Sequence, residues 1–231
     1  MIAAALALAA GGAATLYAAL EPNNSLFGPV TGRGPRDRRV YLTFDDGPNP
    51  EATPRILETL ARYEAPAAFF VVGARARRFP DVARAVAAGG HSIGNHTQTH
   101  VKLHLKGPEP IARELSAGHA SIAATTGVEP RFFRAPHGYR NPFVMREARR
   151  RQYRVFGWTL GVWDSARPGA EEIRRRVRAG LTPGAILLLH DGDGYDPFGD
   201  RAQTAAALPG IIADARAAGY TLAPLTDLLV A

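Results

Sequence analysis

The stretch YLTFDDGPNP, from Tyr41 to Pro50, places two adjacent aspartates where an apolar run ends and a turn begins. Residues 41–44 are typical of a buried strand, and residues 47–50 supply the glycine and prolines of a turn. Two neighbouring carboxylates repel each other and lose hydration on burial, so a chain selected only for stability would avoid them here. Asp45 and Asp46 therefore indicate a functional site at the end of this strand.

The rest of the chain alternates between short apolar segments and segments with helical periodicity. Strands are predicted at residues 40–44, 67–72, 91–95, 131–135, 153–160, 184–190 and 220–225. Helices are predicted at residues 53–63, 78–90, 111–126, 142–151, 169–180 and 204–219. Thr53 is predicted to cap the first helix, with Pro54 in its first turn. About seven βα units with continuous apolar strands predict an α/β fold, with a parallel sheet closed or nearly closed into a helix-covered barrel.

The composition limits the classes of function. The chain has 231 residues, enough for one large domain or two small ones, and it has no cysteine, which excludes disulfides and thiolate metal sites. Its formal net charge of +7 favours anionic partners, but no nucleic-acid-binding motif is present, so nucleic acid is not an expected partner. The arginine runs at residues 149–151 and 174–176 fall in predicted helices and are interpreted as solvated faces.

Residues 1–20, MIAAALALAAGGAATLYAAL, carry no charge, and the first basic residue of the chain is Arg33. The length suits a signal sequence or a marginal membrane span, but a signal sequence normally has positive charge at its start. Either the natural start lies further upstream or the segment is an N-terminal anchor. We favour export or anchoring over a packed apolar helix, although alanine drives insertion weakly. Residues 21–39 are predicted to form a linker or a collar around the domain.

Barrels of this class carry their chemistry at the carboxyl ends of the strands. Polar residues follow the predicted strands here, namely Asp45, Asp46, His96, His100, Arg134, Asp164 and His190. On one helical turn, His96 and His100 would face the same way, and two such histidines with a distant carboxylate form a known zinc arrangement. Alone, this pair would be interpreted as surface polar residues, but the nearby aspartate pair reverses that interpretation. His104 is interpreted as a neighbour of the site.

Five motifs occur in a fixed order along the chain: TFDDGP, NHTQTH, FFRAPHG, WTLGVWD and LLLHD. Together they resemble the motifs of the NodB-type polysaccharide deacetylases, carbohydrate esterase family 4, over about residues 40–225. The resemblance implies a distorted (β/α)7-8 barrel forming a single catalytic domain at residues 40–231. It also implies hydrolysis of N-acetyl groups from amino sugars with one divalent metal, Zn²⁺ being expected and Co²⁺ or Ni²⁺ being alternatives.

The resemblance also implies the role of each matching residue. The metal ligands would be Asp46, His96 and His100. The catalytic residues would be Asp45 as general base, Arg134 beside it, His190 as general acid and Asp164 as the partner of that acid. The backbone N–H of His137 would donate to the oxyanion, and Trp163 would lie on the substrate side.

Two motifs depart from the common pattern of the family. His137 replaces the aromatic residue that usually follows the proline of the third motif, and Ser165 replaces the tryptophan that usually follows Asp164. These changes put the shape of the sugar pocket in doubt and leave the hydrolytic core intact. The glycine-rich segment HDGDGYDPFGDR, residues 190–201, is interpreted as a binding loop over the site.

The expected protein is a metal-dependent deacetylase of peptidoglycan or a chitin-like oligomer. It would be a monomer, exported or membrane-anchored through residues 1–20 and facing a bacterial cell envelope. One alternative is a deacylase or deformylase of a lipid-linked amino sugar, which the apolar N-terminus and the basic surface would suit. Another is a catalytically silent glycan-binding barrel, which the complete set of expected catalytic groups disfavours.

Overall fold

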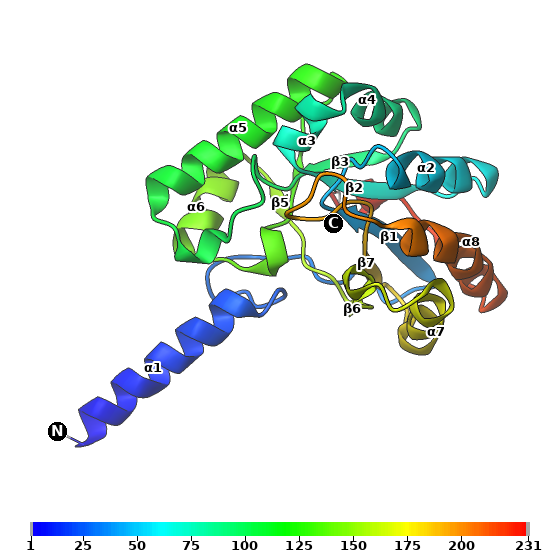
Figure 1. Ribbon diagram of the computed structural model, residues 1–231. Coiled ribbons are helices and arrows are strands. Elements are labelled where there is room, and N and C mark those ends of the chain that lie inside the picture. Colours follow the sequence, from blue (N-terminus) through cyan, green and yellow to red (C-terminus); the bar gives the residue numbers. More distant parts are fainter. Residues whose placement is uncertain (1, 230–231) are drawn as a thin grey trace.

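The computed structural model describes residues 2–229 of the chain and the side chains of residues 11–229 (Figure 1). The strands are β1 (Arg39–Asp45), β2 (Ala67–Val71), β3 (Ser92–Asn95), β4 (Phe132–Phe133), β5 (Arg154–Val155), β6 (Leu160–Gly161), β7 (Ile186–His190) and β8 (Thr221–Leu222). The helices are α1 (Ile2–Leu20), α2 (Ala52–Arg62), α3 (Gly73–Arg78), α4 (Pro80–Ala88), α5 (Pro108–Thr126), α6 (Pro142–Arg150), α7 (Ala170–Gly180) and α8 (Ala202–Ala217).

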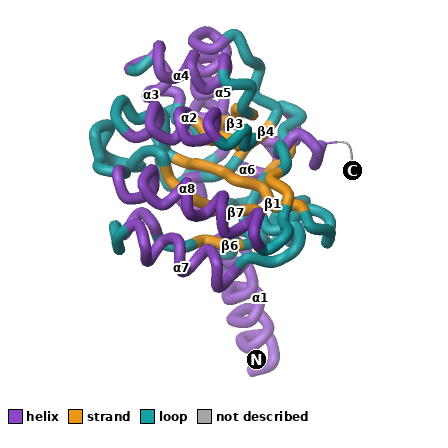
Figure 2. The backbone as a smooth tube through the Cα atoms, turned by 90° about the vertical axis from the view of Figure 1, so that its right-hand side faces the viewer, coloured by secondary structure: helices purple, strands orange, loops and turns teal. Residues whose placement is uncertain are grey.

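The strands form one parallel sheet in the order β5-β4-β3-β2-β1-β7-β6, and β8 pairs with the start of β1. Both faces of β1 are buried, which explains its unbroken apolar run. Leu42 and Phe44 pack on the side covered by the outer helices, whereas Tyr41 packs inside with Phe70. Figure 2 shows helices lying outside the sheet. The predicted single-domain α/β barrel is confirmed.

Strand pairing leaves the barrel open, because β5 and β6 are opposite edges of the sheet. Residues 31–34 bridge this gap. The Thr31 N–H donates to the Val155 carbonyl at 2.9 Å, and the Gly34 N–H donates to the Gly184 carbonyl at 2.8 Å. The segment predicted as a linker or collar therefore packs along the domain and occupies backbone groups that an open sheet edge would expose.

Two predicted elements have different bounds in the structure. The expected strand at residues 153–160 forms β5 and β6, because residues 156–159 carry the chain across the gap between the sheet edges. Both halves are apolar, so periodicity alone joins them. The expected helix at residues 78–90 corresponds to α4 and begins two residues later, at Pro80, because Pro80 has no N–H with which to continue α3.

The predicted cap of α2 is also wrong. The Asn49 side chain, not Thr53, accepts a hydrogen bond from the Ala52 N–H at 2.9 Å. The Thr53 hydroxyl lies inside the helix, where it accepts from the Asn49 N–H at 2.8 Å and donates to the Asp191 carboxylate at 2.6 Å. The Thr53 hydroxyl therefore makes one local hydrogen bond at the start of the helix and one to a residue that is distant in sequence.

Helix α1 projects from the domain (Figure 1), and its last turn is held where the Arg140 N–H donates to the Ala19 carbonyl at 2.9 Å. The predicted anchor, residues 1–20, includes Met1 and the side chains of residues 2–10, which lie outside the described residues. Among the residues that are described, no helix is both long enough and apolar enough to cross a membrane.

Candidate metal and catalytic site

A cleft of about 280 Å³ opens at the carboxyl ends of β1, β3 and β7. Its wall includes the three predicted metal ligands together with Asp45 and His190. Arg134 and Asp164 are each almost fully buried and contact these wall residues from behind. The parallel sheet therefore brings together all seven of the predicted metal-binding and catalytic residues.

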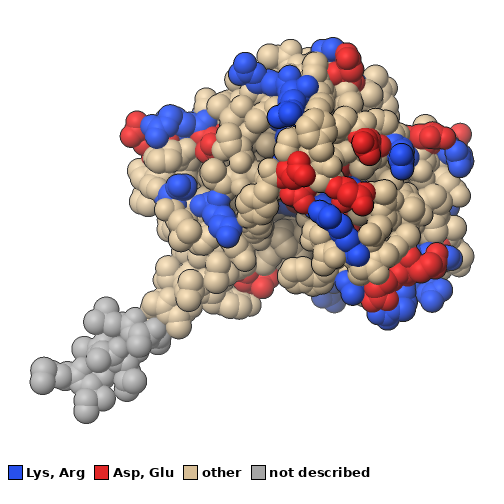
Figure 3. All heavy atoms as spheres, viewed as in Figure 1, with Lys and Arg blue, Asp and Glu red and all other residues tan. Residues whose placement is uncertain are grey.

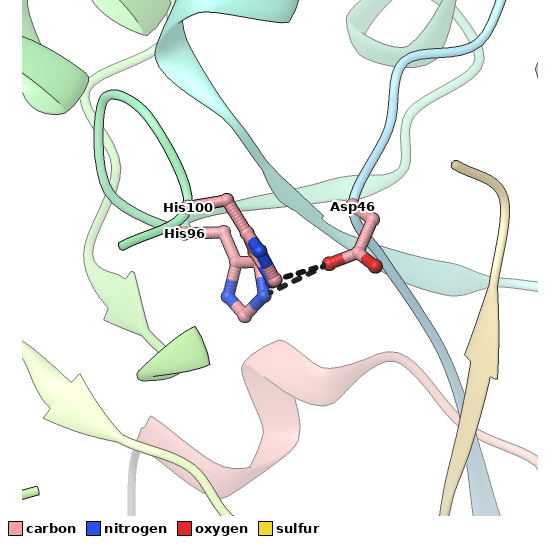
Figure 4. Close-up of side chains that lie close together, drawn as sticks. All are labelled: Asp46, His96 and His100. Atoms are coloured by element: carbon pink, nitrogen blue, oxygen red, sulfur yellow. Dashed lines mark ion pairs between the residues drawn. The ribbon is translucent and has the colours of Figure 1, made fainter. Parts of the chain in front are cut away.

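Asp46, His96 and His100 point toward one another across the cleft (Figure 4). The Asp46 Oδ1 lies 3.2 Å from the His96 Nε2 and 3.0 Å from the His100 Nε2. One possible ligand atom from each residue lies within 4.8 Å of the others. Asp46 has a left-handed backbone conformation, φ 73°, and it contacts these imidazoles while Asp45 contacts Arg134. The two adjacent carboxylates therefore serve different partners.

The histidines lie in a loop after β3, not on the helical turn that their spacing suggested. Thr97 and His100 both have left-handed backbone conformations, with φ values of 70° and 58°. Asn95, at the end of β3, accepts a hydrogen bond from the Thr97 N–H at 2.8 Å, and the Thr97 hydroxyl accepts one from the His100 N–H at 3.0 Å. His104 instead packs its ring against Tyr139, with ring centroids 4.8 Å apart.

The donor set fits a divalent metal. His96 Nδ1 lies 2.7 Å from the Arg134 carbonyl, and since a carbonyl only accepts, Nδ1 carries a proton and Nε2 is the ring atom that faces Asp46. Nε2 is therefore the His96 atom that would bind a cation, beside a carboxylate oxygen 3.2 Å away. Two imidazoles and one carboxylate are a known zinc ligand set with room for further ligands.

The charges of the cluster also favour a cation. Burial raises the pKa of Asp46, but hydrogen bonds and charge from His100 and His96 outweigh it, so this pKa lies well below its usual range. Burial lowers the pKa of His96, but Asp45 and Asp46 raise it by more, so this pKa is above its usual value. The carboxylate is thus ionised, and the site attracts positive charge.

Asp45 is paired with a fully buried arginine. The Arg134 guanidinium donates to the Asp45 Oδ1 at 2.7 Å, to the Thr43 hydroxyl at 2.9 Å and to the Gly157 carbonyl at 2.8 Å. It also lies over the ring of Phe70, 4.1 Å from the centroid. The Asp45 Oδ2 faces the metal cluster, 3.8 Å from the His96 Nε2. One oxygen is therefore held in place, and the other faces the cleft.

His190, the last residue of β7, is held by Asp164, which begins the 3₁₀ turn Asp164–Ala166. One Asp164 oxygen lies 2.8 Å from the His190 Nδ1, and the other accepts from the His190 N–H at 2.8 Å and from the Thr204 hydroxyl at 2.9 Å. Burial lowers the pKa of His190, but the charge and hydrogen bond of Asp164 and the charges of Asp46 and Asp45 raise it to about 9. The imidazole is therefore a proton donor at neutral pH.

Comparison with known proteins identifies the family of this site. Residues 32–156 match the family described as polysaccharide deacetylase. The chain is 39% identical over 204 residues to a chitooligosaccharide deacetylase of Rhizobium leguminosarum bv. trifolii, covering 85% of this chain and 94% of the relative. The chain belongs to the polysaccharide deacetylase family. The fold and the hydrolase activity that the five motifs implied are thus confirmed.

Two further similarities place this polysaccharide deacetylase more closely. It is 36% identical over 213 residues to a peptidoglycan-N-acetylglucosamine deacetylase of Bacillus cereus, covering 91% of this chain and 95% of the relative. Its fold matches that of a CE4 family pseudoenzyme from Bacillus anthracis with a TM-score of 0.79 at 29% identity, covering 86% of this chain and 68% of that chain. Because that pseudoenzyme shares the fold, the fold alone does not indicate catalysis. Catalysis depends on the side chains of the cleft.

The substrate side of the cleft differs from the sequence-based expectation. His137 lines it, at φ 59°, but Trp163 is not part of the wall and its side chain is 75% exposed. Trp158 takes a place in the wall. Tyr195, which sequence reasoning missed, also lines the cleft, with its hydroxyl 3.2 Å from the His137 Nε2. Burial lowers the pKa of His137 to about 4, with the nearby His100 adding to this effect, so the His137 ring is neutral.

Two buried arginines hold the loop of Tyr195 over the cleft. Arg75 of α3 donates to the backbone carbonyls of Asp193 and Asp196. Arg201 donates to the Gly192 carbonyl at 2.6 Å and to the Asp193 carboxylate at 2.8 Å. The loop predicted to cover the site does so in a fixed shape, and its length and aromatic residue were the only sequence signals of this role.

Proposed function

We propose that this protein is a zinc-dependent deacetylase that removes N-acetyl groups from amino-sugar residues of peptidoglycan or a chitin-like oligomer. The supporting observation is that Asp46, His96 and His100 converge on one point, with Asp45 and His190 lining the same cleft. The known relatives act on chitooligosaccharides or peptidoglycan, as their names state, which favours a polymer over a lipid-linked amino sugar.

The residues of the cleft supply a complete set of proton-transfer groups. When bound, the metal would act as a Lewis acid toward the acetyl carbonyl and would lower the pKa of a water in the cleft. Asp45 takes the proton of the attacking water through Oδ2, because Arg134 binds Oδ1. The water oxygen adds to the carbonyl carbon, the C–N bond breaks, and His190 protonates the departing amine as acetate is released. Asp164 keeps His190 oriented and protonated until that step.

The oxyanion would be stabilised by a backbone donor. Among the described residues, the His137 N–H has no hydrogen-bond acceptor, although its neighbour Gly138 donates to the Ala135 carbonyl at 2.8 Å. Because the N–H belongs to the backbone, replacing the family's usual aromatic side chain with His137 leaves it in place. Such a donor contributes about 10²–10³ in rate.

The location and assembly state belong to the same proposal. We infer an exported or membrane-anchored monomer that faces the cell envelope, because residues 1–20 carry no charge and the expected substrates are extracellular glycans.

Acetate release from N-acetylglucosamine oligomers by metal-depleted and zinc-restored protein tests the proposal. Depletion should abolish acetate release, and one zinc ion per chain should restore it. Replacing zinc with Co²⁺ or Ni²⁺ tests the choice of metal. No acetate release from several oligomers and peptidoglycan fragments with any of these metals would refute the proposed activity.

A further inference from the structure

A second and larger cavity, of about 550 Å³, lies away from the catalytic cleft and contains none of the metal-binding or proton-transfer residues. One face of α6 forms part of its wall through Pro142, Met145, Arg146 and Arg149, which are spaced as neighbours on a helix surface. The starts of β4 and β5 and the segment of residues 27–29 complete it. The wall is therefore part apolar and part basic.

Three of the four arginines in the wall of this cavity lack a carboxylate partner among the described residues. Within the described part of the chain, Arg131, Arg146 and Arg149 have no carboxylate at ion-pair distance, and all three residues are exposed. Arg146 instead lies over the ring of Phe143, 5.4 Å from its centroid. The fourth arginine of the wall, Arg154, donates to the Thr31 hydroxyl at 3.0 Å.

Helix α7 shows that this lack of partners is a local property. Arg174 pairs with Asp214 at 2.8 Å, and Arg175 and Arg176 each pair with Glu172 at 2.7 Å. Figure 3 shows basic and acidic side chains intermixed on the side of the molecule where α7 lies. The second arginine run, interpreted from the sequence as a solvated face, is paired with carboxylates, whereas Arg149 of the first run faces a cavity.

Large apolar residues are exposed on α1, on α6 and in the segment that follows α1. On α1 the exposed residues are Leu16, Tyr17 and Leu20. Leu26, beyond α1, and Phe143, on α6, are also exposed. Figure 1 shows α1 leaving the domain on the side of α6. The buried Arg140 fixes this arrangement, because its guanidinium donates to the Glu21 carbonyl at 2.8 Å and to the Asn24 carbonyl at 3.0 Å. An apolar helix and a basic cavity are thus held together on one side of the domain.

We propose that this cavity binds the phosphate headgroup of an anionic phospholipid, so that this side of the domain docks on a bilayer. Guanidinium groups match the geometry of phosphate oxygens, and the apolar wall residues Met145, Tyr153 and Val155 suit the glycerol and upper acyl carbons of a lipid. Basic residues at an anionic membrane surface add attraction, and neighbouring exposed aromatic and leucine side chains enter the interface.

Docking on this side would keep the catalytic cleft close to the bilayer. The Asn23 side chain, just beyond α1, donates at 2.8 Å to the carbonyl of Trp158, whose side chain lines the cleft. The headgroup site would then determine which glycans the enzyme reaches, namely those next to the membrane surface.

Binding of the full chain to vesicles of phosphatidylcholine, with and without phosphatidylglycerol, tests the headgroup site. We expect tighter binding to the anionic vesicles, with a preference that weakens as salt is added. The double variant Arg146→Glu, Arg149→Glu should lose about 30-fold in affinity for anionic vesicles, from about 1 kcal/mol for each arginine at the surface. Its binding to neutral vesicles should not change, since α1 is intact.

The double variant Arg77→Glu, Arg178→Glu is the matched control, because it makes the same charge change at exposed positions on α3 and α7. This control should keep most of the preference for anionic over neutral vesicles. Both double variants should deacetylate soluble oligomers like the unmodified chain, which would show that they fold. Equal losses in the two double variants would overturn the proposal in favour of net charge alone. Glycerol phosphate binding as tightly as the anionic vesicles would overturn it in favour of a soluble phosphate compound.

Discussion

The two halves of the cleft use the same residue types for different chemistry. In one half, Asp46 faces the Nε2 atoms of His96 and His100, and His96 Nδ1 is already bonded to a backbone carbonyl. In the other half, Asp164 is bonded to the Nδ1 atom of His190, which leaves Nε2 for the cleft. A carboxylate that faces Nε2 can therefore bind a metal together with the imidazole, whereas a carboxylate bonded to Nδ1 keeps the imidazole protonated.

The comparison predicts the largest effect in the metal half. His96→Ala removes a ligand from a three-residue set, so metal content should fall to background. Acetate release should fall by about 10³-fold or more, since Lewis-acid stabilisation is worth several kcal/mol. Metal analysis of purified protein and acetate assays measure both quantities. His104→Ala is the matched control, because His104 packs on Tyr139 and should leave the metal bound. Full metal content in His96→Ala would show that the cluster is not the metal site.

Asp45→Asn should separate metal binding from proton transfer. The amide oxygen introduced by this substitution could still accept a hydrogen bond from Arg134, so the cleft should keep its shape and its metal, whereas the general base is lost. Activity should fall by about 10²–10⁴-fold, the usual contribution of general acid–base catalysis. Measuring metal content beside kcat decides the matter. If Asp45→Asn loses the metal and Asp46→Asn keeps it, the two aspartates have exchanged the roles assigned here.

The acid half should respond mainly in its pH dependence. The pKa of His190 is raised to about 9, so the acid is protonated below that pH and activity should fall as the pH rises through its pKa. A bound cation would offset the part of the shift that Asp46 causes. In Asp164→Asn, burial would act on His190 without the opposing carboxylate, so the alkaline limb of the kcat profile should move to lower pH. Thr204→Val is the control, because it removes one hydrogen bond to Asp164 and leaves its charge. An unmoved limb in Asp164→Asn would exclude His190 as the acid.

The sequence allowed much of this arrangement to be predicted, for a physical reason. Parallel strands buried on both faces appear as continuous apolar runs, and the polar residue after each run must lie at the same edge of the sheet. That rule located Asp45, Arg134 and His190 without knowledge of any contact between them. It failed at residues 153–160, where one apolar run supplies two strands at opposite edges of the sheet.

Residues that depend on loop shape were not predictable in the same way. Tyr195 reaches His137 only because Arg75 and Arg201 hold the backbone of its loop, and the contacts of Arg75 and Tyr195 join elements far apart in the sequence. The capping role of Asn49 was missed for another reason, since the helix begins at Ala52 and Thr53 already lies inside it. Local sequence rules give the hydrogen bonds that a side chain can make, and contacts between residues distant in sequence determine which of them form.

The smallest effect concerns the loop that covers both halves. The Tyr195 ring is 72% exposed beside His137 and His100, which suits contact with a sugar ring and not a structural role. Tyr195→Ala should raise KM for oligomers by about two- to tenfold and leave kcat nearly unchanged, if the ring contributes the roughly 0.5–1.5 kcal/mol typical of aromatic contacts. Phe198→Ala is the control on the same loop, because Phe198 packs on Phe79, with ring centroids 5.6 Å apart, and is not part of the cleft wall. Equal KM values for Tyr195→Ala and the unmodified enzyme would place the substrate elsewhere in the cleft. A fall in kcat alone would mean that the loop instead positions the metal ligand His100.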